Sequence, residues 1–176
     1  MQIERVEIQV IGSETERYTW SDDLPEQYQS NTLLRVYTDA GLEGIAGIWN
    51  ATSFGYDRYT AESLRHLVPI LIGRDPCERE SILHDLRPRV FPQPPGALAV
   101  IDIALWDLYG KACGEPVWGL LGGYRDKVPA YADGIGYDKD LTPQKVAALV
   151  QAHAALGYDA VKFHLTKPDP EAALET

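Results

Sequence analysis

The sequence predicts an α+β domain over residues 1–126, followed by the incomplete start of a β/α barrel over residues 127–176. Before residue 50, short segments alternate apolar and polar residues with a period of two, and helical patterns follow them. After residue 127 the order becomes strand, helix, strand, helix, which is typical of parallel strands in βα units. A closed β/α barrel takes roughly 250 residues, so we expect only its first units in these 176 residues.

The first domain is predicted to contain a small antiparallel meander. Strands are expected over residues 3–11, 32–38 and 43–49, where apolar and polar residues alternate. A tight turn that ends at Gly41 joins the last two strands, since glycine readily supplies a positive φ. Residues 12–30 are polar and irregular, so we expect a long loop there, and loops of that length are often functional.

Helices are predicted to follow the meander. Residues 57–72 show apolar residues at helical spacing, and a second helix is expected to begin at Asp75, with a proline at the next position. The strongest helical pattern covers residues 97–113, whose wide apolar stripe indicates a nearly buried helix that ends at Gly114. A short helix is expected over residues 116–121.

The second part of the chain is predicted to be built from βα units. Strands are expected over residues 128–132 and 159–165, and a helix capped by a Thr-Pro pair is expected over residues 142–156 between them. Pro170 is expected to open a further helix. Short connections of this kind make the two strands parallel neighbours.

Composition excludes several classes of function. The net charge is −10 with no basic cluster, which argues against nucleic acid and against an anionic membrane surface as partners. No stretch approaches the roughly 20 apolar residues that span a bilayer, and the N-terminus reads directly as a strand without a signal peptide. Cys77 and Cys113 suggest neither a disulfide framework nor a zinc site, so we expect two buried thiols and a cytoplasmic protein.

Two acidic residues on the strongest predicted helix do not form a carboxylate pair. Asp102 and Asp107 lie five residues apart, which is about 140° around a helix, so their side chains do not face each other. We interpret Asp102 as a charge on a structural helix and Asp107 as a surface or capping contact.

Lys162 and His164 are the candidate catalytic residues. They lie two residues apart on a predicted strand, so their side chains share one face of it. Inside a barrel, each could lose its proton more easily after desolvation and act as a base. An edge strand with a polar face open to water explains the same alternation, and both interpretations remain open.

Longer segments of the sequence carry a family resemblance. In order and spacing they resemble the enolase superfamily, in its mandelate racemase and muconate-lactonizing branch. The segments are AVIDIALWDLYGKA (99–112), GEPVW (114–118), LLGG (120–123), VPAYA (128–132) and GYDAVK (157–162), with GLEGIAG (41–47) and LIGRDP (71–76) before them.

The resemblance implies a chemistry and a cofactor. Members have an N-terminal capping domain and a modified barrel, bind Mg²⁺, and abstract a proton α to a carboxylate, with the metal stabilising the enediolate. Lys162 matches the first lysine of the family's Lys-x-Lys pattern, and His164 replaces the second, where it would be a base, an acid or a structural residue. This departure favours an acid-sugar dehydratase, a lyase, with a racemase, epimerase or cycloisomerase also possible. The family's metal ligands come from later barrel strands, so no metal ligand is expected among these residues.

The resemblance also implies a substrate and further contacts. The substrate is expected to be a small carboxylate, an acid sugar, and the full-length protein is expected to be a homo-oligomer. Tyr18, Trp20, Trp49 and Tyr56 lie in or beside the two predicted loops that would cover the substrate, although loop aromatics are as often packing anchors. We expect the isolated chain to be inactive and poorly soluble. The alternative is a non-catalytic capping module that acts in binding or oligomerisation.

Overall fold

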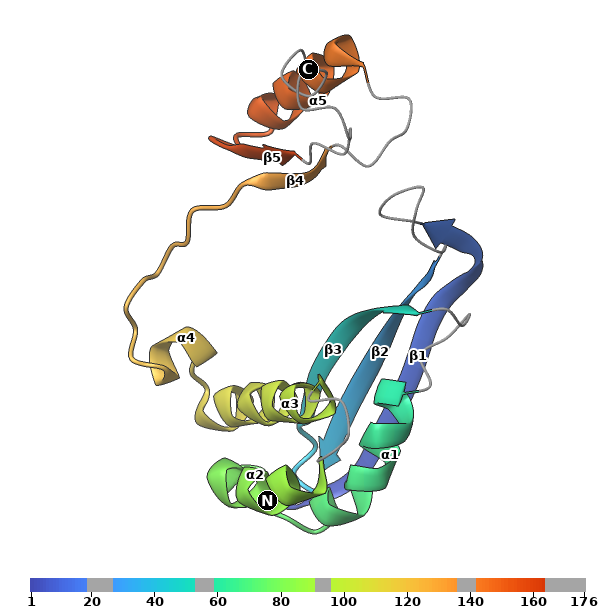
Figure 1. Ribbon diagram of the computed structural model, residues 1–176. Coiled ribbons are helices and arrows are strands. Elements are labelled where there is room, and N and C mark those ends of the chain that lie inside the picture. The colour runs from blue at the N-terminus through green and yellow to red at the C-terminus, as the bar shows by residue number, and fades with distance from the viewer. Residues whose placement is uncertain (19–26, 53–58, 91–95, 136–141, 164–176) are drawn as a thin grey trace. The chain divides into compact units, whose positions relative to one another are not determined.

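The computed structural model describes residues 1–18, 27–52, 59–90, 96–135 and 142–163 (Figure 1). The described residues divide into two compact units, one that extends to Tyr124 and one that begins at Arg125. Within the described part of the chain, no helix has both the length and the apolar character required to cross a membrane.

The first unit contains a three-stranded antiparallel sheet in the order β1-β2-β3. Its strands are β1 (Ile3–Tyr18), β2 (Gln27–Thr38) and β3 (Glu43–Thr52), and Gly41 takes a φ of +74° in the turn before β3. The predicted meander is therefore confirmed.

The long loop predicted over residues 12–30 is wrong at both of its ends. Residues 12–18 continue β1 and residues 27–30 begin β2, with Gly12 paired to Ser30 and, beyond an irregularity, Arg17 paired to Tyr28. Backbone hydrogen bonds to a neighbouring strand, which the local sequence does not reveal, stabilise these polar extensions.

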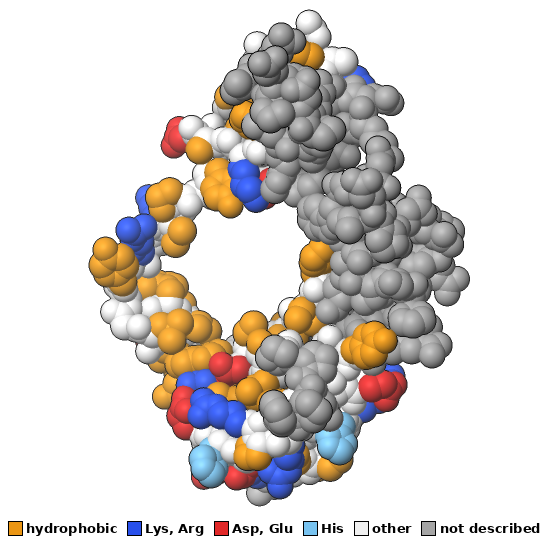
Figure 2. Space-filling model, in the orientation of Figure 1, with side chains coloured by type: hydrophobic (Ala, Val, Ile, Leu, Met, Phe, Trp, Pro, Cys, Tyr) orange, Lys and Arg blue, Asp and Glu red, His pale blue; other side chains and the backbone are white. Residues whose placement is uncertain are grey.

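Helices cover one face of this sheet, as Figure 1 shows. The covering helices are α1 (Tyr59–Leu71), α2 (Arg79–Leu86) with a 3₁₀ turn at Arg87–Arg89, and α3 (Gly96–Cys113). The short helix α4 (Val117–Leu120) follows α3 and packs against it. Acidic and basic side chains are interspersed on the surface of this unit (Figure 2). The predicted start of the second helix at Asp75 is wrong. Asp75 instead builds a turn, in which its Oδ1 accepts a hydrogen bond from the Cys77 backbone N–H at 3.0 Å, because short acidic side chains compete with helix in this way.

The core of the first unit lies between the sheet and α1, α2 and α3. Its close packing is clearest at Gly44, where a Cβ atom would lie 2.4 Å from the Ala104 carbonyl oxygen of α3. The fully buried large side chains of this core are Ile3, Leu34, Val36, Leu64, Leu67, Leu71, Ile82, Leu86, Val100, Ile101, Leu105 and Leu108.

The prediction of buried thiols is wrong, since Cys77 and Cys113 are both exposed. Cys77 lies in the turn before α2, and Cys113 is the last residue of α3, so neither position faces the core. Partial desolvation, followed by the nearby Asp75 carboxylate, raises the pKa of the Cys77 thiol.

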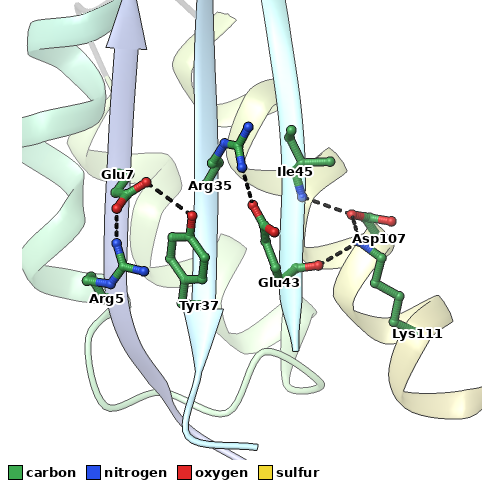
Figure 3. A network of polar contacts seen from close by, with 8 residues as sticks. All are labelled: Arg5, Glu7, Arg35, Tyr37, Glu43, Ile45, Asp107 and Lys111. Carbon is green, nitrogen blue, oxygen red and sulfur yellow. Dashed lines mark hydrogen bonds and ion pairs between the residues drawn. The ribbon is translucent and has the colours of Figure 1, made fainter. Parts of the chain in front are cut away.

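Two side chains of α3 occupy the free edge of β3 (Figure 3). Asp107 Oδ2 accepts a hydrogen bond from the Ile45 backbone N–H at 2.9 Å. Lys111 Nζ donates to the Glu43 backbone carbonyl at 2.6 Å and to Asp107 at 2.7 Å. The interpretation of Asp107 as a surface or capping contact missed this role, because it depends on how α3 packs against the strand.

The second unit contains a βαβ arrangement. β4 (Ala132–Ile135) and β5 (Val161–Phe163) are parallel, and α5 (Pro143–Ala155) lies between them in sequence. The Thr142 hydroxyl accepts a hydrogen bond from the Lys145 backbone N–H, which confirms the predicted cap.

The first strand of the second unit is shifted from its predicted position. Residues 128–131 lie outside the strand, because pairing begins where Ala132 meets Val161 of β5. The helix predicted from Pro170 lies outside the described residues. The predicted fold class, an α+β capping domain with the start of a β/α barrel, is confirmed.

Candidate active site

Lys162 lies on β5, the shorter of the two paired strands described in the second unit. The strand follows Gly157, whose φ of +91° ends the preceding helix, and pairs with β4 through Ala132 and Val161. The Lys162 side chain is 45% exposed. An accessible ammonium group at this position can contact a small anion.

Asp133 of β4 is the partner of Lys162 that sequence reasoning missed. Lys162 Nζ donates to Asp133 Oδ2 at 2.9 Å, and the Asp133 side chain is 41% exposed. The sequence contains a signal, since an acidic residue follows the predicted strand directly, but the strand was placed four residues too early. A half-exposed ion pair of this kind contributes only about 0–1 kcal/mol to stability. Stabilisation alone therefore does not explain why these two residues are paired here.

The positively charged member of this pair could bind an anion. A lysine ammonium has three N–H donors, and one of them is taken by Asp133. An ammonium group of this kind suits the oxygens of a carboxylate. The location of Lys162 on a strand of a βαβ unit agrees with the sequence-based prediction, whereas its catalytic role stays a prediction.

The predicted aromatic contacts have different outcomes. Trp49 lies near the end of β3 and is 48% exposed, on the sheet face opposite the helices. Tyr18 is the last residue of β1, where its backbone pairs with Gln27. Trp20 and Tyr56 lie outside the described residues. Because the structure describes the side chain of Trp49 alone among these four aromatic residues, their contact with substrate stays a prediction.

His164 follows β5 directly and also lies outside the described residues. Its role therefore stays a prediction. Among the residues that the structure describes, no group of three His, Cys, Asp or Glu side chains could hold a metal ion.

Comparisons with known proteins agree on one family. The model of the mandelate racemase / muconate lactonizing enzyme N-terminal domain matches residues 25–122. A D-galactonate dehydratase family member of Marinomonas sp. strain MWYL1 is 36% identical over 77% of this chain and 33% of its own length. A D-mannonate dehydratase of Rhizorhabdus wittichii is 37% identical over 77% of this chain and 33% of its own length.

Solved structures share the fold. A racemase from Streptomyces coelicolor A3(2) with bound magnesium has a TM-score of 0.82 at 26% identity, over 98% of this chain and 51% of that one. L-talarate dehydratase from Polaromonas sp. JS666, complexed with Mg and L-glucarate, has a TM-score of 0.82 over 98% of this chain and 48% of that one. Its identity of 20% shows the fold alone. The chain spans about a third of the length of the two curated relatives above.

Proposed function

Because the chain belongs to the mandelate racemase / muconate lactonizing enzyme family, we propose that it forms the capping domain and first barrel strands of a Mg²⁺-dependent acid-sugar dehydratase. Relatives named D-galactonate and D-mannonate dehydratase support the reaction class. The observation that carries the proposal is the accessible Lys162 ammonium, held by Asp133 on the neighbouring parallel strand.

In this proposal, the Lys162 ammonium group binds the carboxylate of the acid sugar. Its charge attracts electron density toward the carboxylate, which makes the proton on the α-carbon easier to remove. A Mg²⁺ ion, when bound by residues outside the described part of the chain, would stabilise the resulting enediolate. His164 exchanges a proton on one side of the substrate, either at the α-carbon or at the departing β-hydroxyl.

The capping domain has a second task in this proposal. Tyr18, Trp20, Trp49 and Tyr56 are proposed substrate contacts that exclude water from the reacting carbon. Aromatic side chains suit this purpose, since they present rigid apolar area together with polar groups for a sugar.

The first test compares Lys162 variants. The residues are assayed within a polypeptide that carries a complete barrel, with Mg²⁺ and a panel of aldonic and aldaric acids, and the 2-keto-3-deoxy product is trapped as a semicarbazone. Lys162→Met is expected to reduce kcat/KM by about 100-fold or more, because the carboxylate loses its cation. Lys162→Arg is the matched control, since it keeps the charge, and is expected to retain part of the activity. A Lys162→Met variant with unchanged kcat/KM would contradict the proposal.

The second test separates dehydration from racemisation, which the similarity to a racemase at 26% identity keeps as a second candidate. Reaction in D₂O is followed by NMR. A dehydratase forms a keto product with loss of water, whereas a racemase exchanges the α-proton and keeps the hydroxyl. His164→Asn is expected to slow either reaction through kcat, and a change in KM alone would show that His164 only positions the substrate.

A further inference from the structure

The second unit carries two oppositely charged side chains on one face of its paired strands. Ala132 of β4 and Val146 of α5 are buried, and α5 packs against β4, so Ala132 marks the face that the helix covers. Asp133 comes next on the strand and points to the opposite face, because successive side chains of a strand alternate. Lys162 of β5 donates to Asp133 Oδ2 at 2.9 Å, so both charged groups lie on the face away from α5.

The charges of this pair decide which small molecules it suits. At neutral pH the Lys162 ammonium and the Asp133 carboxylate carry opposite unit charges, so the pair as a whole is neutral. A simple carboxylate that approaches Lys162 also approaches Asp133. At similar distances the repulsion from Asp133 cancels much of the attraction to Lys162. A site that received only simple anions would therefore bind them more tightly with an uncharged residue at position 133.

A zwitterion is attracted by both members of the pair. The carboxylate and the ammonium of an α-amino acid are attached to the same carbon atom, so they can reach two groups that lie only 2.9 Å apart. The carboxylate then accepts from Lys162, and the α-ammonium donates to Asp133. Hydrogen bonds between charged groups are roughly twice as strong as those between neutral groups. An α-hydroxyl could also donate to Asp133, but it has no charge to offset the repulsion between the two carboxylates.

The backbone holds the two charged groups side by side and accessible. Parallel pairing joins Ala132 to Val161 before them and Ile135 to Phe163 after them, so the strands and not a loop set their spacing. The Asp133 and Lys162 side chains are 41% and 45% exposed, which leaves room for a ligand to contact both. Groups that are positioned before binding lose little conformational entropy when a ligand arrives.

We propose that Lys162 and Asp133 together recognise the carboxylate and the α-ammonium of an amino acid, and that the substrates of this site include β-hydroxy-α-amino acids in addition to acid sugars. The inference rests on the proposed function for its reaction, the loss of water from a β-hydroxy carboxylate. Lys162 keeps its role toward the carboxylate, and Asp133 is the residue that determines specificity at the α-carbon.

The reaction of such a substrate begins as it does for an acid sugar. A base takes the α-proton, the electrons of that C–H bond form a double bond to the β-carbon, and the β-hydroxyl departs with a proton as water. A proton then moves from the nitrogen to the β-carbon, which converts the product into an iminium ion. Water hydrolyses the iminium ion to a 2-oxo acid and an ammonium ion. The sequence needs neither an oxidant nor a reductant.

Matched ligands that differ in one group test the recognition step. Serine and glycerate share a carbon skeleton, a carboxylate and a β-hydroxyl, but serine carries an α-ammonium where glycerate carries an α-hydroxyl. Binding of both enantiomers of each is measured by isothermal titration calorimetry with EDTA, so that no metal-dependent turnover occurs, in a polypeptide that carries a complete barrel. The wild-type protein should bind the preferred enantiomer of serine about tenfold more tightly than that of glycerate.

Variants at position 133 identify the cause of that preference. Asp133→Asn keeps the shape of the side chain and removes its charge, so the preference for serine should fall about tenfold and disappear. Asp133→Glu keeps the charge and should retain part of the preference. Asp159→Asn is the matched control, since it removes the charge of an exposed residue that lies before β5, and it should leave the preference unchanged.

Turnover with Mg²⁺ provides a second measurement. The 2-oxo acid that forms from a β-hydroxy-α-amino acid is trapped as a semicarbazone, and the released ammonium ion is assayed separately. Asp133→Asn should raise KM for the amino acid about tenfold and leave kcat within a few-fold, because Asp133 binds the ammonium and takes no part in proton transfer. With an acid sugar, the same variant should show an unchanged or lower KM.

Three results would overturn the inference. One is a wild-type protein that binds glycerate as tightly as serine or binds neither, which decides the matter even where a variant fails to fold. Another is a folded Asp133→Asn variant that keeps the wild-type preference, and the third is an equal loss of preference in Asp159→Asn. Dehydration of acid sugars by a protein that shows no preference for serine would leave the proposed function standing and remove this inference alone.

Discussion

Replacement of Asp107 by Ala tests whether α3 stabilises the edge of the sheet. The Asp107 carboxylate accepts a hydrogen bond from the Ile45 backbone N–H at 2.9 Å and from Lys111 Nζ at 2.7 Å. A hydrogen bond to a charged group contributes about 1.5–3 kcal/mol, and a helical pair four residues apart about 0.3–0.5 kcal/mol. The Asp107 and Lys111 side chains are 30% and 44% exposed, so solvent screening lowers the expected loss to about 1–2 kcal/mol.

The assay is urea unfolding followed by circular dichroism, with the free energy extrapolated to water. Asp107→Asn is expected to lose about half as much as Asp107→Ala, because its amide oxygen can still accept the Ile45 hydrogen bond. Glu62→Ala is the matched control, since its pair with Arg65 joins side chains that are 64% and 55% exposed and should change stability by less than about 0.5 kcal/mol. An Asp107→Ala variant as stable as Glu62→Ala would refute the reasoning.

Two further predictions concern packing and pH. Gly44→Ala should destabilise the first unit by about 1–3 kcal/mol in the same urea assay, because its Cβ would lie 2.4 Å from a backbone carbonyl oxygen of α3. Gly119→Ala is its control, with an ordinary 3.8 Å contact, and a similar loss in both variants would contradict this explanation. The Arg74 hydrogen bond lowers the pKa of Asp85 below its usual 3.8, so this pair stabilises the fold above that pH, and the contribution is lost as the pH falls through the lowered value. Asp85→Asn should therefore show a weaker loss of stability in acid titrations, and an identical acid profile would show that the pair contributes nothing.

The sequence predicted those parts of the fold that one buried face determines. The apolar stripe of α3 and the alternation in β2 both follow from a single shared core, so local periodicity is enough to find them. Gly41 could be predicted as a turn because its conformation depends on its own residue type. The polar ends of β1 and β2 could not be predicted, since they are stabilised by pairing between segments that are distant in sequence.

The difference between local sequence patterns and the pairing of distant segments also explains which residues of the candidate site could be predicted. Lys162 could be identified because its family motif is continuous in sequence. Its partner Asp133 lies 29 residues away and becomes adjacent only when two parallel strands pair. Asp107 was missed for a similar reason, because its acceptor role depends on a backbone N–H that lies 62 residues away.

The hydrogen bonding at the sheet edges also limits the pairing of a further strand with this sheet. On β3, Asp107 and Lys111 occupy the backbone groups of Ile45 and Glu43. On β1, the Ile3 backbone N–H donates to the Arg74 carbonyl at 2.9 Å, and its carbonyl accepts from Gly73 at 2.8 Å. Strand addition at these positions would first have to break those hydrogen bonds.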